Sequence, residues 1–261
     1  VKLTQQQLQE DSVNREKGIS TSLCAKWLPS ENASSDHTKQ MARRLAKKLS
    51  MTSRQYRRML SAYRQYMDVV EVKMSSGRWT DINYEAVPSR ANLVYNTAFL
   101  RNDEDRRREF LGAVKKGEQT IHAGVLYPHD IVHSYVDTER KPGWWYLNSP
   151  DDTLEALWKA LPDYVQGNGN TLCVADGSGS MFSRVGNTKV TCLDVANALA
   201  IYFAEHCTGQ FRDTYITFSQ TPQFVDLSKG KTLHDKIEIA MSHNEVANTN
   251  IEAVFDLILN T

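Results

Sequence analysis

Apolar residues recur at intervals of three and four through the first part of the chain, between short polar loops. This period predicts amphipathic helices, because the side chains of a strand would alternate every second residue. The clearest case is a helix that begins near Ser53 and has one apolar stripe: Tyr56, Leu60, Tyr63 and Met67. We therefore predict an all-α, helical-repeat-like region at residues 1–165.

A second predicted helix begins just after Ser35, which is a suitable N-cap residue. Asp36 favours its first turn because the helix dipole places partial positive charge there. Its predicted buried side steps by four residues: Met41, Leu45 and Leu49. Further along, residues 101–110 (RNDEDRRREF) interleave both signs of charge, which predicts an exposed helix with internal ion pairs.

From about residue 166 the pattern changes to short apolar runs that alternate with helical segments. The predicted strands are residues 171–175, 215–218 and 223–227, and the predicted helices are residues 192–207, 233–241 and 251–259. The first of these helices is expected to bury Leu193, Ala196, Leu199, Ala200 and Phe203. Strands that alternate with helices predict a doubly wound α/β domain at residues 166–261, so the expected fold class is α+β.

The formal net charge of zero conceals an uneven distribution, because basic residues are in excess before residue 161 and acidic residues after it. Between His37 and Met67 the chain has Lys and Arg but no Asp or Glu, a bias that can attract phosphate. A solvated helix surface is the alternative interpretation. The predicted nucleic-acid contacts are Lys39, Arg43, Arg44, Lys47, Lys48, Arg54, Arg57, Arg58 and Arg64.

Several protein classes do not fit the sequence. No segment approaches the ~20 apolar residues of a membrane helix, and the polar N-terminus lacks the apolar core of a secretory signal. The four cysteines have no CxxC spacing, which favours reduced thiols. We therefore expect an intracellular, cytoplasmic protein with no membrane partner.

Two groups of residues have both a chemical and a structural interpretation. His129 and His133 stand four apart, a spacing that suits a shared zinc ion, but no motif supplies a third ligand, so we favour a structural role. Trp144, Trp145 and Trp158 are expected to pack in a core or between domains.

The most informative segment is DGSGSM at residues 176–181, between a predicted buried strand and a predicted helix. Its glycines permit a tight turn, in which Asp176, Ser178 and Ser180 bring three oxygens together. Such hard oxygen ligands suit Mg²⁺ above all, with Mn²⁺ or Ca²⁺ as alternatives. The spacing fits neither a glycine-rich phosphate loop nor a serine nucleophile elbow.

This Asp-x-Ser-x-Ser spacing resembles the metal-ion-dependent adhesion site (MIDAS) of von Willebrand factor A-type domains. The resemblance implies that Thr249, just before the helix at residues 251–259, is a further metal ligand. Together with other segments, such as KWLPS at residues 26–30, the chain resembles an uncharacterised plant, fungal and viral family. Members of that family join a helical region to a C-terminal A-type domain. That arrangement is distantly similar to the Ro ribonucleoprotein (TROVE), which binds RNA.

The sequence also departs from the pattern of A-type domains. The last Asp ligand of A-type domains would follow Thr261, so we expect a truncated domain in a fragment of a longer protein. The first hypothesis is a non-enzymatic binding protein, whose cation is completed by an acidic residue of a protein partner. The alternatives are an RNA-binding protein that uses the basic helical region, and an Asp176-dependent phosphohydrolase.

Overall fold

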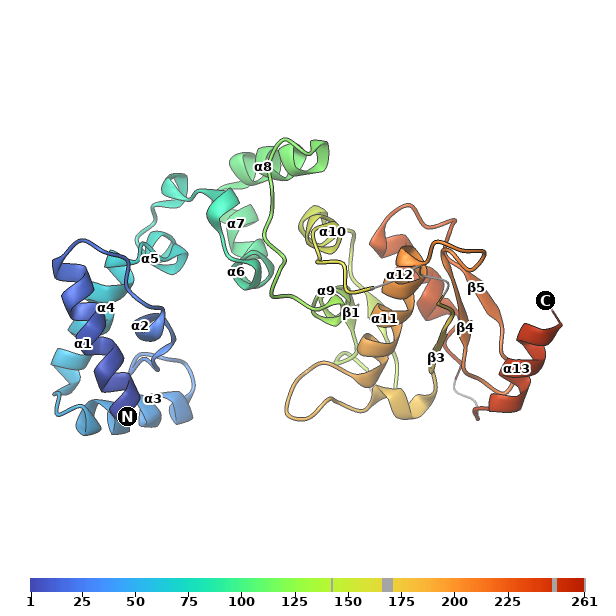
Figure 1. Ribbon diagram of the computed structural model, residues 1–261, viewed down its shortest axis with the longest axis horizontal. Helices are drawn as coiled ribbons and strands as arrows, with labels where there is room; N and C mark the ends of the chain where they lie inside the picture. The colour runs from blue at the N-terminus through green and yellow to red at the C-terminus, as the bar shows by residue number, and fades with distance from the viewer. Residues whose placement is uncertain (142, 166–170, 246–247, 261) are drawn as a thin grey trace. The chain divides into compact units, whose positions relative to one another are not determined.

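The computed structural model describes residues 1–141, 143–165, 171–245 and 248–260 (Figure 1). The described protein is mostly helical, with a small mixed sheet near its C-terminal end. The chain divides into two compact units, Val1–Ile82 and Asn83–Thr261. Helices from residues 83–165 therefore belong to the same unit as the sheet. The predicted boundary at residues 165/166 adjoins residues 166–170, which lie outside the described residues, and it stays a prediction.

The first unit is helical. Its helices are α1 (Lys2–Glu16), α2 (Cys24–Trp27), α3 (Asp36–Lys48), α4 (Ser53–Tyr66) and α5 (Val70–Ser75), followed by a 3-10 turn at Trp79–Asp81. The predicted starts of α3 and α4 are confirmed. Ser35 Oγ accepts a hydrogen bond from the Thr38 N–H, and Thr52 forms a capping box with Gln55.

The core of this unit forms where α4 meets α1, α2 and α3. Tyr56, Leu60 and Tyr63 are buried as predicted, and the Tyr63 hydroxyl donates to the Leu8 carbonyl at 3.1 Å. The predicted stripe on α3 is wrong at Met41, which is 47% exposed. The small residues Ala42 and Ala46 are buried in its place, together with Leu49.

The second unit contains further helices and two sheets. Its helices are α6 (Ser89–Val94), α7 (Asn96–Asn102), α8 (Glu104–Lys116), α9 (Pro128–Tyr135), α10 (Asp152–Lys159), α11 (Cys192–His206), α12 (Leu233–Ser242) and α13 (Ile251–Leu259), with 3-10 turns at Tyr84–Ala86 and Gly179–Phe182. Its strands are β1 (Val136–Asp137), β2 (Tyr146–Leu147), β3 (Cys173–Ala175), β4 (Thr214–Thr217) and β5 (Phe224–Asp226).

The larger sheet has the order β3-β4-β5, and β4 runs parallel to β3 but antiparallel to β5. Val174 pairs with Ile216 at its centre. Figure 1 shows α11 and α12 on one side of this sheet and α13 beyond the other. The carboxyl ends of β3 and β4 thus meet at one edge, the position where open α/β sheets bind ligands.

Three expectations about burial are wrong. Arg107, in the segment expected to be an exposed helix, is completely buried among Tyr84, Phe99 and Phe110. Trp144 is 53% exposed, whereas Trp158 is buried as expected. The predicted side of α11 is wrong at Leu199, which is 39% exposed, although Leu193 and Ala200 are buried as predicted. Its buried surface extends to residues outside that side, such as Ile201 and Tyr202. Because α11 packs against α9 and α12 as well as β3 and β4, it is covered on several sides.

Among the described residues, no helix combines the length and the apolar character that crossing a bilayer requires.

Candidate functional site

The loop that follows β3 brings the predicted carboxylate and hydroxyl groups together. The Ser178 N–H donates a hydrogen bond of 2.8 Å to Oδ1 of Asp176, the first residue after the strand. This bond is the local turn that Asp favours through its short acceptor side chain. The hydroxyl oxygens of Ser178 and Ser180 lie 3.0 Å apart. One carboxylate and two hydroxyls are thus held within one short segment.

Gly177 sets how closely this loop approaches the C-terminal end of α12. A Cβ atom at position 177 would lie 2.5 Å from Asn244 Oδ1 and 3.0 Å from Asn244 Cα. Both distances are shorter than ordinary van der Waals separations, so a larger residue would displace the loop or Asn244. The glycine between Asp176 and Ser178 therefore has a steric reason.

A second loop, between α12 and α13, lies at the same edge of the sheet. The Asn250 N–H donates to the Ser219 carbonyl at 3.2 Å, and the Phe218 N–H donates to the Ala175 carbonyl at 2.7 Å. These bonds connect the second loop to the end of β4 and the end of β4 to the end of β3. The Asn250 side chain also accepts from the Ala253 N–H at 3.1 Å and so caps α13.

An open depression of about 720 Å³ lies where the two loops meet. It is lined by Asp176, Ser178, Gly179, Ser180, Gln220, Asn248 and Thr249. All four metal ligands expected from the sequence thus line one depression. Gln220 and Asn248 were missed, although Gln220 follows the predicted second strand and could have been found from that position. Among the described residues of this lining, Asp176 alone carries a charge.

The donor chemistry of the depression fits a hard divalent cation. The lining offers carboxylate, hydroxyl and amide oxygens, the groups that Mg²⁺ and Ca²⁺ prefer. Adjacent ligands of an octahedral Mg²⁺, each about 2.1 Å from the ion, lie about 3.0 Å apart. The Ser178 and Ser180 hydroxyls, which are hydrogen-bonded to each other at 3.0 Å, are therefore close enough to be adjacent ligands of one ion. Within the described chain, the hydrogen bond seen on the Asp176 carboxylate is the one that Oδ1 accepts from the Ser178 N–H.

The histidine pair has a structural setting. His133, on α9, lies with Nδ1 2.9 Å from Oδ2 of the buried Asp194, and Asp194 also forms a capping box with Thr191 at the start of α11. The hydrogen bond to Asp194 raises the pKa of His133, while burial lowers it. His129 stacks on Tyr127 instead. In the described part of the chain, no three His, Cys, Asp or Glu residues are placed to share a metal ion.

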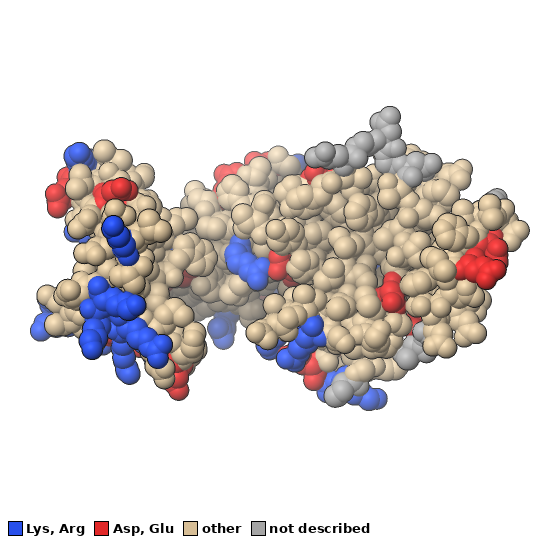
Figure 2. Space-filling model, turned by 60° about the horizontal axis from the view of Figure 1, so that its bottom comes forward, with Lys and Arg blue, Asp and Glu red and all other residues tan. Residues whose placement is uncertain are grey.

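The basic residues predicted to contact nucleic acid lie on α3 and α4 of the first unit, and three of them have a partner within it: Lys39, Arg57 and Arg64. The Arg64 guanidinium donates to the carbonyls of Ala25, Lys26 and Leu28, so its role is structural. Lys39 pairs with Asp36 at 3.0 Å. Arg57 is exposed, and so are the remaining basic residues: Arg43, Arg44, Lys47, Lys48, Arg54 and Arg58. Figure 2 shows Lys and Arg gathered on this unit.

Comparison with known proteins places the chain in a family. Residues 2–171 match the family described as "Domain of unknown function (DUF2828)", and residues 170–261 match "Domain of unknown function (DUF7788)". The chain is 30% identical to "Uncharacterized protein L728" of Acanthamoeba polyphaga mimivirus. That alignment covers 99% of the chain but 46% of the viral protein, so the chain spans less than half of this relative. No solved structure matches. The chain belongs to the family of the "Domain of unknown function (DUF2828)".

Proposed function

We propose that this protein binds a divalent cation, Mg²⁺ above all, in the depression at the ends of β3 and β4, and through it an acidic residue of a protein partner. The observation that carries the proposal is the meeting of Asp176, Ser178, Ser180 and Thr249 around one open depression. These residues come from two loops more than 60 positions apart in the sequence, so their meeting is a property of the fold.

Charge explains why the partner would be acidic. The lining provides one negative charge, from Asp176, against the two positive charges of the cation. Mg²⁺ keeps near-ideal octahedral coordination and commonly retains waters when few protein ligands are available. A carboxylate from a partner can replace such a water and neutralise the remaining charge. The open shape of the depression leaves room for it.

The proposed A-type fold gains support from the strand arrangement. The Asp-x-Ser-x-Ser loop follows β3 directly, β4 is parallel to β3, and β5 forms an antiparallel edge. The resemblance to A-type domains implies that the Asp-x-Ser-x-Ser loop follows the first strand of such a sheet. It also implies that Thr249 approaches the same site from a later loop.

The lining favours binding over catalysis. An aspartyl phosphotransferase needs a second acidic group near the nucleophile, and position 178 has Ser where that group would stand. Among the described residues of the depression, Asp176 has no carboxylate, His or Lys neighbour that could act as an acid or base. We therefore propose a non-enzymatic role.

Manganese titration tests the proposal. Electron paramagnetic resonance of free Mn²⁺ should show one bound ion per chain, and excess Mg²⁺ should displace it. Asp176→Asn should weaken binding at least tenfold, because it removes the one charged ligand. Asp256→Asn, an exposed carboxylate on α13, is the matched control and should bind as the wild type does.

Equal Mn²⁺ binding by the wild type and Asp176→Asn, or no binding by either, would overturn the proposal. Phosphate release from a chromogenic ester, lost in Asp176→Asn, would assign the phosphohydrolase instead.

A second candidate function, RNA binding, is supported by the exposed basic residues of α3 and α4. Arg57 pairs with Glu31 at 3.9 Å. No ion pair is seen within the described chain for six others: Arg43, Arg44, Lys47, Lys48, Arg54 and Arg58. If all six contact single-stranded RNA, log affinity should fall with log salt at a slope of about −4. Filter binding that shows no salt dependence would refute this candidate.

A further inference from the structure

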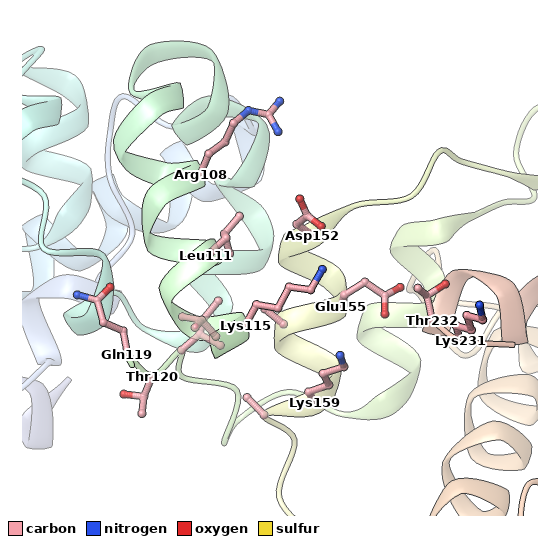
Figure 3. Close-up of a pocket in the computed structure, with 15 residues that line it drawn as sticks. Arg108, Leu111, Lys115, Gln119, Thr120, Asp152, Glu155, Lys159, Lys231 and Thr232 are labelled. Carbon is pink, nitrogen blue, oxygen red and sulfur yellow. The ribbon is translucent and has the colours of Figure 1, made fainter. Parts of the chain in front are cut away.

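Figure 3 shows a second pocket within the unit Asn83–Thr261, which shares no lining residue with the cation depression. Its volume of about 580 Å³ is within the usual range for small-molecule sites. One face of α8 lines one side, with Arg108, Leu111, Gly112 and Lys115, and one face of α10 lines another, with Asp152, Glu155, Ala156 and Lys159. Each set follows the helical spacing of three and four residues, so two regular helix faces form the walls.

Three lysines give this pocket its positive charge. Lys115 comes from α8, Lys159 from the end of α10, and Lys231 from the segment before α12. Figure 3 shows Lys115 extending from α8 toward α10. In the described part of the chain, none of their ammonium groups forms an ion pair or a hydrogen bond. Arg108, by contrast, pairs with Glu104 at 2.8 Å.

Within the described chain, neither carboxylate of the lining forms a direct ion pair with these lysines. Glu155 accepts hydrogen bonds from the backbone N–H groups of Leu233 and His234, at 2.9 and 3.0 Å, and from the Tyr135 hydroxyl at 3.0 Å. It is therefore committed to the N-terminal end of α12, where partial positive charge balances it. With Asp152 included, four basic residues face two acidic ones.

The rest of the lining combines aliphatic residues with the polar Gln119, Thr120 and Thr232, and it contains a glycine that widens the pocket. Leu111, Val114 and Ile121 contribute apolar surface. Gly112 lies inside α8, where glycine is unfavourable, yet a Cβ atom there would meet nothing within 4 Å. Packing therefore does not require this glycine, and its effect is to leave open space in the wall.

We propose that this pocket binds a small molecule with a phosphate group and an aliphatic body. The three lysines attract the phosphate, and the aliphatic wall covers the body. A phosphate is favoured over a single carboxylate because its higher charge can be shared among the three ammonium groups. This proposal is independent of the cation site, because the two linings share no residue.

Calorimetric titration of the 261-residue chain with hexyl phosphate tests it, with inorganic phosphate and hexanol as matched probes. Hexyl phosphate should bind at least tenfold more tightly than either. Lys115→Gln/Lys159→Gln should weaken it at least tenfold, whereas Lys116→Gln/Lys229→Gln, the same charge change outside the lining, should not.

Gly112→Leu should abolish binding by filling the pocket, and Gly112→Ala should largely retain it. Thermal unfolding of each variant establishes that it is folded. Unchanged affinity in Gly112→Leu or in Lys115→Gln/Lys159→Gln would overturn the proposal. So would equal affinity for inorganic phosphate, or no binding of hexyl phosphate at millimolar concentration.

Discussion

Replacing Gly177 by alanine should weaken cation binding with only a modest loss of stability. The added Cβ would lie 2.5 Å from Asn244 Oδ1 and 3.0 Å from Asn244 Cα, where ordinary separations begin at 3.4 Å. The amide oxygen can rotate away. The backbone atom cannot, so the loop must move by about 0.4 Å, which exceeds the ~0.2 Å tolerance of metal–ligand distances.

A displacement of this size should weaken Mn²⁺ binding about 10- to 100-fold, which corresponds to about 1.4–2.8 kcal/mol. Overpacking should lower the free energy of unfolding by about 1–3 kcal/mol. Electron paramagnetic resonance measures the first quantity and urea unfolding the second. Gly124→Ala is the matched control, because a Cβ there enters open space.

A double variant tests the steric argument itself. Asn244→Ala removes the side-chain atoms that would lie 2.5 and 3.1 Å from the new Cβ, so that only the backbone of residue 244 still crowds it. Gly177→Ala/Asn244→Ala should therefore recover part of the lost Mn²⁺ affinity. Wild-type affinity in Gly177→Ala alone would refute the inference that this close approach positions the metal ligands.

Three further predictions concern buried or paired cationic groups. Arg107→Ala should lower the free energy of unfolding by about 3–5 kcal/mol, because it leaves a cavity and removes hydrogen bonds. Arg107→Met should lower it by only about 1–2 kcal/mol, because burial already disfavours the charge and lowers the Arg107 pKa to about 10. Equal losses of the two variants in urea unfolding would contradict this. The pKa of His133 is raised, so the protonated ring stabilises the fold fully below the ordinary histidine pKa of 6.5, and this effect is lost as pH rises through the raised pKa. The wild type should therefore exceed His133→Asn in free energy of unfolding by more at about pH 5.5 than at about pH 8.5. Arg64→Gln should destabilise the first unit by about 2–4 kcal/mol and leave the salt slope of RNA retention unchanged, whereas a smaller slope would return Arg64 to the RNA-binding surface.

The elements of this fold could be predicted well where one periodic face decides burial. Tyr56, Leu60 and Tyr63 follow helical spacing and are buried on α4. On α3 the same reasoning selected Met41, because it weighs hydrophobicity and not the close approach that Ala42 and Ala46 permit.

The half-buried Arg64 and the buried Arg107 could not be identified from the sequence, because most of their partners are distant in it. Arg64 is held by carbonyls 36 to 39 residues away, and Arg107 by Asn92 and by Thr153, which is 46 residues away. A charge pattern alone places both at the surface. Only the folded chain shows that carbonyls and aromatic rings surround them.

The residues of the candidate site likewise include some that the sequence could predict and others that depend on the folded chain. Asp176, Ser178 and Ser180 were identified because their spacing is local, and Thr249 because a family resemblance supplied its order. Asn248 depends on how the second loop returns to the sheet. The phosphate pocket had no sequence signal, because α8 and α10 are far apart in the chain and each has an ordinary amphipathic pattern.

Helix α12 has one end at each of the two proposed sites. The backbone N–H groups of its first residues donate to the Glu155 carboxylate in the wall of the pocket, and Asn244, just past its last turn, lies close against Gly177 in the loop after β3. Its ten residues span about 15 Å as a rigid rod. By thermodynamic reciprocity, a pocket ligand that shifts this rod changes the affinity for the cation by the same factor that the cation changes the affinity for the ligand.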